Sequence, residues 1–226
     1  MVSAADLRAG RQRRGLTQAQ AAARLGVSQA YLSLLETGRR RVSSRLLAHM
    51  QREFSLGPTA LPFLDGLRGD PARLAAGLGG LGYPGFAHLR SRRRLNPAQV
   101  LLVALQQDTL ESRAAAALPW VAAEFSRLDW DWLIARVKLA DCQNRLGFVV
   151  SLGRQVAIRR HDVDAASRLG RVEQLLEPSR LAREDSLGQA DMTDAEHRWL
   201  RRHRPDDAQR WNLLSDLRLE HLTYAT

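Results

Sequence analysis

Residues 16–38 constrain the fold of this chain more than any other stretch. They contain two short helical patterns, Gln18–Leu25 and Gln29–Glu36, and only Gly26, Val27 and Ser28 stand between them. Three residues leave room for nothing but a tight turn between consecutive helices. We therefore predict two short helices joined by a tight turn.

Each predicted helix has a start signal and an apolar side. Thr17 and Ser28 each stand one residue before a helical pattern, where a hydroxyl oxygen accepts a hydrogen bond from an unpaired backbone N–H. The residues expected on the facing sides of the two helices are Ala22, Leu25, Val27, Leu32 and Leu35. Together these features predict a helix-turn-helix.

This stretch resembles the Cro/CI-type (XRE family) helix-turn-helix domains of phage repressors and bacterial regulators. The matching positions are Leu16, Thr17, Gln18, Ala22, Gly26, Val27, Ser28, Leu32, Ser33, Leu35, Glu36 and Gly38. The resemblance covers roughly residues 3–56 and implies a lambda-repressor-like domain that binds duplex DNA.

The resemblance also implies a set of DNA contacts. The base-reading positions are Gln29, Ala30 and Ser33, and a glutamine amide suits a bidentate bond to adenine N6 and N7. The positions expected to contact the DNA backbone are Gln18, Tyr31, Arg39, Arg40 and Arg41. The three arginines are included because they directly follow the second helix, and the alternative for them is a solvated charged face. Tyr31 is alternatively a surface aromatic residue.

Glu36 is assigned a structural role, because relatives use it to tie down the fold, often through an arginine. Leu34 departs from relatives that place a polar or basic residue there, which argues against a phosphate bond from this position.

Charge is distributed unevenly along the chain. Residues 1–60 hold ten arginines against Asp6, Glu36 and Glu53, whereas the remainder holds 24 basic and 21 acidic residues. Basic side chains release the counterions condensed on nucleic-acid phosphates. This distribution indicates a phosphate-backbone partner for the N-terminal part, and the resemblance implies that this partner is double-stranded DNA.

The sequence also bears on cellular location. No stretch reaches the about 18 consecutive apolar residues of a membrane span, and the early Asp6 and arginines are unlike a signal peptide. A cytoplasmic protein without a membrane partner is expected. Cys142 is the only cysteine, which excludes an intramolecular disulfide and predicts a core residue.

The predicted domains are residues 1–56, 57–85 and 86–226. In the first, a helix is expected from Ala4 to Arg14 with Ser3 and Asp6 at its start, and a fourth helix is expected after Ser43 or Ser44. Residues 57–85 hold eight of the 16 glycines and four of the eight prolines. Residues 71–78 have the pattern of a short helix, but the glycines favour a flexible or irregular linker.

Residues 86–226 are predicted to form an irregular helical bundle, so the fold class is all-α. A long helix is expected after Asp129 toward Val149 or Val156, with Gly147 as a kink or a close contact, and a last helix is expected from Asp206 or Asp207 through Leu217. All five tryptophans lie in this domain and either anchor its core or line an interface.

The sequence shows no arrangement typical of catalysis. Its histidines and carboxylates beyond residue 85 lack metal-ligand spacing, and no glycine-rich phosphate loop or nucleophile elbow is present. We therefore predict no enzyme activity, no catalytic residues, no metal and no cofactor.

The functional prediction is a sequence-specific transcriptional regulator, a homodimeric repressor that binds an inverted-repeat operator. The alternative is the antitoxin of a toxin–antitoxin pair, which represses its own operon and binds a toxin protein through its C-terminal domain. A third hypothesis makes the C-terminal domain an enzyme or a small-molecule receptor.

Overall fold

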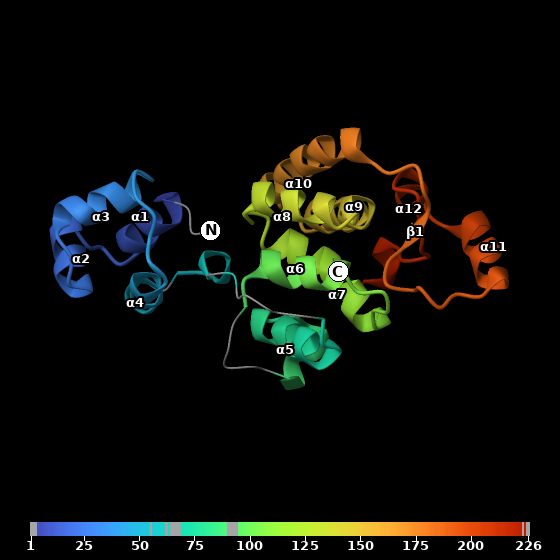
Figure 1. The fold of residues 1–226 in the computed structure, drawn as a ribbon, viewed down its shortest axis with the longest axis horizontal. Coiled ribbons are helices and arrows are strands. Elements are labelled where there is room, and N and C mark those ends of the chain that lie inside the picture. The colour runs from blue at the N-terminus through green and yellow to red at the C-terminus, as the bar shows by residue number, and fades with distance from the viewer. Residues whose placement is uncertain are drawn as a thin grey trace. The chain divides into compact units, whose positions relative to one another are not determined.

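Two folded units make up the chain. The computed structural model describes residues 4–54, 56–61, 63, 69–89, 95–222 and 224. One unit comprises residues 1–65 and 94–96, and the other comprises residues 66–93 and 97–226. Both are built from helices (Figure 1), and the only strands among the described residues are β1 (Asp185–Ser186) and β2 (Leu213–Leu214), which pair in parallel. The predicted all-α fold class is confirmed.

Four helices form the N-terminal unit. They are α1 (Ala4–Arg13), α2 (Gln18–Leu25), α3 (Gln29–Glu36) and α4 (Ser44–Phe54), followed by the 3-10 turn η1 (Pro58–Ala60). The predicted start at Ser3 and the side chain of Asp6 lie outside the described residues. Ser43 begins α4, because its Oγ accepts the N–H of Leu46 at 3.3 Å.

The predicted starts of α2 and α3 are confirmed. Thr17 Oγ1 accepts the N–H of Gln20, and Ser28 Oγ accepts the N–H of Tyr31, both at 3.2 Å. Gly26 ends α2 with a φ of 66°, a left-handed conformation that costs a glycine little. The chain therefore reverses between α2 and α3 in a tight turn, as predicted.

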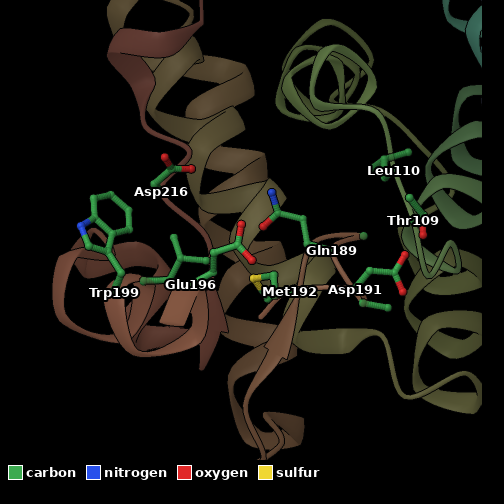
Figure 2. Close-up of a pocket in the computed structure, with 11 residues that line it drawn as sticks. Thr109, Leu110, Gln189, Asp191, Met192, Glu196, Trp199 and Asp216 are labelled. Atoms are coloured by element: carbon green, nitrogen blue, oxygen red, sulfur yellow. The ribbon is translucent and has the colours of Figure 1, made fainter. Parts of the chain in front are cut away.

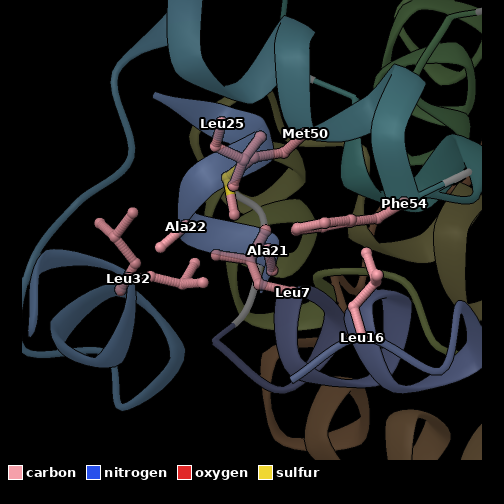
Figure 3. Close-up of a cluster of buried hydrophobic side chains, with 9 residues drawn as sticks. Leu7, Leu16, Ala21, Ala22, Leu25, Leu32, Met50 and Phe54 are labelled. Atoms are coloured by element: carbon pink, nitrogen blue, oxygen red, sulfur yellow. The ribbon is translucent and has the colours of Figure 1, made fainter. Parts of the chain in front are cut away.

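The core of the N-terminal unit draws on all four helices and is shown in Figure 3. Its buried members are Leu7, Leu16, Ala21, Ala22, Leu25, Leu32, Leu35, Met50 and Phe54. Four of the five apolar residues predicted on the facing sides are among them, and Val27 packs against the cluster from its edge. Burial of this apolar surface holds the two motif helices at a fixed angle.

The C-terminal unit is organised around one central helix. Its elements are α5 (Pro71–Leu81), η2 (Pro84–Leu89), α6 (Pro97–Leu105), α7 (Ser112–Glu124), α8 (Trp130–Leu139), α9 (Gln143–Arg159), α10 (Val163–Leu176), η3 (Glu177–Ser179), α11 (Asp194–His203), α12 (Asp206–Arg210) and η4 (Leu219–His221). Helix α9 packs most extensively against α7 and α10 (Figure 1). Cys142, just before α9, is buried as predicted, and burial raises the pKa of its thiol.

Part of the segment predicted to be an irregular linker is a helix. Helix α5 begins at Pro71, after Asp70 accepts the N–H of Ala72 at 2.9 Å, and it ends at Gly82. Gly77 and Gly79 are buried, and a side chain on Gly79 would collide with the carbonyl oxygen of Phe86 in η2. These glycines permit close packing, so glycine content did not indicate flexibility here.

The long helix predicted after Asp129 is instead two helices. Between α8 and α9, Asp141 has a φ of 54°, which a continuous right-handed helix does not allow. The N–H of Cys142 bonds the carbonyl of Val137 at 2.8 Å and closes the turn. Of the two roles predicted for Gly147, a kink or a close contact, the structure shows the close contact. Gly147 lies inside the continuous helix α9, against the ring of Trp211.

The end of the chain is less helical than predicted. Helix α12 stops at Arg210, and Leu213 and Leu214 are extended beside β1. Trp211 is fully buried and donates its Nε1–H to Ser151 Oγ at 2.9 Å. Trp120 is also buried, whereas Trp199 is 51% exposed. The tryptophans therefore include both core anchors and a surface residue.

Candidate nucleic-acid interface

Helix α3 is anchored by one side and exposed on the other. Leu32 and Leu35 are buried in the core, whereas Gln29 and Ala30 are exposed and Ser33 is half-buried. The three residues predicted to read bases thus lie on the part of α3 that the core leaves uncovered. A rigid helix with a polar and small-residue face suits the major groove of DNA.

A buried ion pair fixes the end of α3 to α1. Arg11 donates from Nε to Glu36 Oε1 at 2.6 Å and from Nη2 to Glu36 Oε2 at 3.0 Å, and its Nη1 donates to the carbonyl of Leu16 at 2.7 Å. The Glu36 side chain is 1% exposed. This geometry gives Glu36 the structural role expected of it.

The protonation state of Glu36 follows from its partners. Burial alone would raise the pKa of its carboxyl, but the hydrogen bonds from Arg11 and Gln18 and the charge of Arg11 outweigh burial, so the pKa is lowered. Glu36 is therefore ionised at neutral pH, and a bidentate pair between charged groups holds the motif together.

Gln18 belongs to the same network. Its Nε2 donates to Glu36 Oε2 at 2.9 Å. An amide nitrogen carries two hydrogens, so one remains for a DNA phosphate, as does the backbone N–H in the first turn of α2. The structure thus places Gln18 in a second role that the sequence did not reveal, as a hydrogen-bond donor to the buried carboxylate.

Three arginines follow α3, and a tyrosine lies on the helix itself. Arg39, Arg40 and Arg41 are exposed, and within the described ranges none of them has an ion-pair partner. The Arg40 guanidinium lies 5.7 Å from the centre of the Tyr31 ring, a cation–π distance. The structure therefore brings together Tyr31 and Arg40, two of the residues predicted to contact the DNA backbone.

Sequence reasoning missed a basic stripe on α4. Arg45, His49 and Arg52 are spaced four and three residues apart, so they share one side of α4, and with Tyr31 they border a cavity of about 540 Å³. The signal for this stripe in the sequence is the spacing of the three basic residues. Leu34 is half-buried one helical turn after Ala30, so the apolar side chain lies next to the predicted base-reading residues.

The capped turn, the anchored α3 and its exposed face define a helix-turn-helix DNA-binding domain. A family model described as Helix-turn-helix matches residues 7–55, which confirms the resemblance drawn from the sequence. The chain thus carries the DNA-binding domain of a transcription regulator. Comparisons with curated proteins and with solved structures return no match.

Two further findings concern membrane spans and metal sites. No helix among the described residues has both the length and the apolar character needed to span a bilayer. No three His, Cys, Asp or Glu side chains in the described ranges are grouped as a metal site requires.

Proposed function

We propose that the protein is a homodimeric repressor that binds an inverted-repeat operator. In this proposal Gln29, Ala30 and Ser33 contact base edges in the major groove. The DNA backbone is contacted by Gln18, Tyr31, Arg39, Arg40 and Arg41. No enzymatic step is assigned to the chain.

One observation carries the proposal: α3 exposes Gln29 and Ala30 while Leu32, Leu35 and the Arg11–Glu36 pair hold it from behind. A base-reading side chain must be presented by a rigid element, because specificity depends on hydrogen-bond geometry. The exposed arginines that follow α3 supply the positive charge that phosphate contacts require.

The proposed dimer is supported by the short length of DNA that one helix-turn-helix motif contacts. A single recognition helix contacts only a few base pairs, and two of them meet successive major-groove faces about 34 Å apart. The C-terminal unit is proposed to supply the association between two chains, through surfaces other than the DNA-contacting face.

Selection of duplexes from a random-sequence pool by the full chain tests the proposal. We expect an enriched inverted repeat whose half-sites are centred about 10 base pairs, or a multiple of that, apart. Failure to enrich any sequence would contradict sequence-specific binding, and enrichment of a single half-site bound by one chain would contradict the dimer. An antitoxin would enrich an operator in the same way, and would differ only by forming a stable complex with a toxin protein.

A further inference from the structure

A cavity of about 500 Å³ opens in the C-terminal unit, and none of the residues that line it is assigned to DNA contact. Its walls come from the loop before α7, the segment before α11, and α11 itself. Leu110 and Leu200 are buried at its base and Met192 is half-buried, so its floor is apolar. This volume lies within the range of about 300–1,000 Å³ that is typical of small-molecule sites.

Hydrogen bonds between distant segments hold this cavity open. The N–H of Leu110 bonds the carbonyl of Gly188 at 2.7 Å, and the N–H of Ala190 bonds the carbonyl of Asp108 at 3.0 Å. Gly188 has a φ of 67°, and a side chain there would overlap Leu110, so only glycine fits this crossing. The wall is thus part of the fold and needs no ligand to form.

Helix α11 presents three residues to the cavity from one side. The helix begins with a capping box, in which Thr193 Oγ1 accepts the N–H of Glu196 at 3.3 Å. Trp199 and Leu200 follow Glu196 by three and four residues, so the three side chains share the side of the helix that lines the cavity. In Figure 2 the Glu196 carboxylate points toward Gln189 across the middle of the pocket, with Trp199 and Asp216 beyond Glu196 on one side.

The exposed indole of Trp199 has a fixed orientation. The imidazole of His203 stacks on it with ring centres 4.5 Å apart and planes 19° apart, and His203 Nδ1 lies 2.8 Å from the carbonyl oxygen of Trp199. Exposure of the apolar indole surface to water is unfavourable, and a bound ligand or partner that covers this surface removes the cost. Held in place by its neighbour, this indole offers an aromatic surface beside the cavity.

Three carboxylates line the rim of the cavity. Asp191, Glu196 and Asp216 are exposed at the cavity, and none of them has an ion-pair partner in the part of the chain that the structure describes. Glu196 Oε2 accepts hydrogen bonds from the backbone N–H and from the Oγ1–H of Thr193.

We infer that this cavity binds an organic cation, an ammonium or guanidinium group carried on an apolar stem. The apolar floor suits the stem, the three carboxylates attract the positive charge, and the indole of Trp199 stabilises a cation over its ring. An anion is repelled by the rim, and a neutral ligand gains nothing from it. The inference concerns the C-terminal unit and stands independently of the proposed DNA contacts.

Calorimetric titration of the full chain tests the ligand chemistry. The first pair of probes is phenethylamine and 2-phenylethanol, which share an aromatic stem and differ in charge. The second pair is the peptides Gly-Arg-Gly amide and Gly-Gln-Gly amide, which represent a cation supplied by another protein. We expect at least one cationic probe to bind about tenfold more tightly than its neutral counterpart. Equal affinities within both pairs would overturn the inference.

Matched variants locate the site. Glu196→Gln keeps a capping residue at the same helix position but removes a charge from the cavity. It should lower the affinity for the cationic probe about fivefold. Trp199→Ala should lower the same affinity by about fivefold as well. Asp194→Asn removes an exposed charge from the same helix turn but does not line the cavity, and should leave affinity unchanged. Equal effects of the Glu196 and Asp194 variants, with unfolding midpoints unchanged, would place the binding elsewhere and overturn the inference.

Discussion

At the scale of single residues, the N-terminal unit depends on one buried network. Arg11, Glu36 and Gln18 come from three different helices and meet at a carboxylate that solvent hardly reaches. Removing one member of such a pair is costly because the other charge remains buried without its partner. The network therefore ties the stability of the motif to the ionisation of Glu36.

Glu36→Gln should destabilise the N-terminal unit by about 3 kcal/mol at pH 7, because Arg11 loses its charged partner. All five tryptophans lie in the C-terminal unit, so hydrogen exchange of the α2 and α3 amides is the suitable measurement. Glu53→Gln, at a half-buried glutamate without an ion-pair partner in the described ranges, is the control and should change little. Equal exchange rates in the two variants would contradict the role of the network.

The pH dependence of the same protection follows from the lowered pKa of Glu36. A carboxyl whose pKa is lower in the folded state contributes stability that is fully present above its unfolded pKa, about 4.3. That contribution is lost as pH falls below this value and through the folded pKa. Protection of α2 and α3 in the unsubstituted protein should therefore fall in this acid range. Glu36→Gln should lack this part of the pH dependence, and an identical profile in both proteins would contradict the assignment.

Base reading is separable from phosphate contact by comparing two residues. Gln29→Ala should cost about 1–3 kcal/mol on the selected operator and much less on random DNA, because it removes a base-edge contact. Arg40→Ala should weaken binding to every sequence and reduce the salt dependence by roughly one phosphate contact. Gel-shift titrations at several salt concentrations measure both, with Gln12→Ala on α1 as the control. Equal losses for Gln29→Ala on operator and random DNA would show that it does not specify sequence.

At the scale of elements, a glycine in α9 and a glycine in α10 differ in how closely their surroundings pack. A side chain on Gly147 would overlap the ring of the fully buried Trp211. On Gly170 in α10, the nearest atom to a new methyl group is Arg154 Nε at 3.6 Å, an ordinary contact. The first glycine is required by packing, and the second is not.

Gly147→Ala should therefore destabilise the C-terminal unit by about 1–3 kcal/mol through overpacking, although alanine favours the helix itself. Gly170→Ala should instead stabilise it by about 0.5–1 kcal/mol through helix propensity alone. Urea unfolding followed by tryptophan fluorescence reports on this unit. A stabilising effect of Gly147→Ala would mean that Trp211 does not hold its position against α9.

At the scale of the whole molecule, the two units should be separable, but not at the boundaries expected from composition. The core of the N-terminal unit lies between Leu7 and Phe54, with Leu56 packed against it. Helix α5 contributes Leu74, Leu78 and Leu81 to the buried residues of the chain and belongs to the C-terminal unit. A C-terminal fragment therefore needs α5 to complete its packing.

A fragment of residues 69–226 should unfold cooperatively, whereas one of residues 83–226, which lacks α5, should be clearly less stable. Tryptophan fluorescence in urea compares the two.

A fragment of residues 1–61 should fold but bind the operator at least about a hundredfold more weakly than the full chain, because it loses the effective concentration that a linked second motif supplies. Full affinity in this fragment would show that the C-terminal unit does not mediate assembly.

The sequence by itself determined the helix-turn-helix, because that motif is specified by neighbours a few residues apart. Thr17 and Ser28 cap the helices they precede, Gly26 allows the reversal, and the leucines of α2 and α3 recur at helical spacing. The exposed positions of α3 follow from the same spacing. Local signals of this kind need no knowledge of the rest of the chain.

Only the tertiary structure decided the features that join distant residues. Gly79 packs against η2, Gly147 packs against Trp211, and the segment around Gly188 meets the loop at Leu110 to form the cavity beside Trp199. Each depends on contacts between segments separated along the chain, and glycine content or apolar spacing has the same appearance whether such a partner is present or not. Packing selects among conformations that local propensity leaves nearly equal in free energy, so these features emerged only from the folded chain.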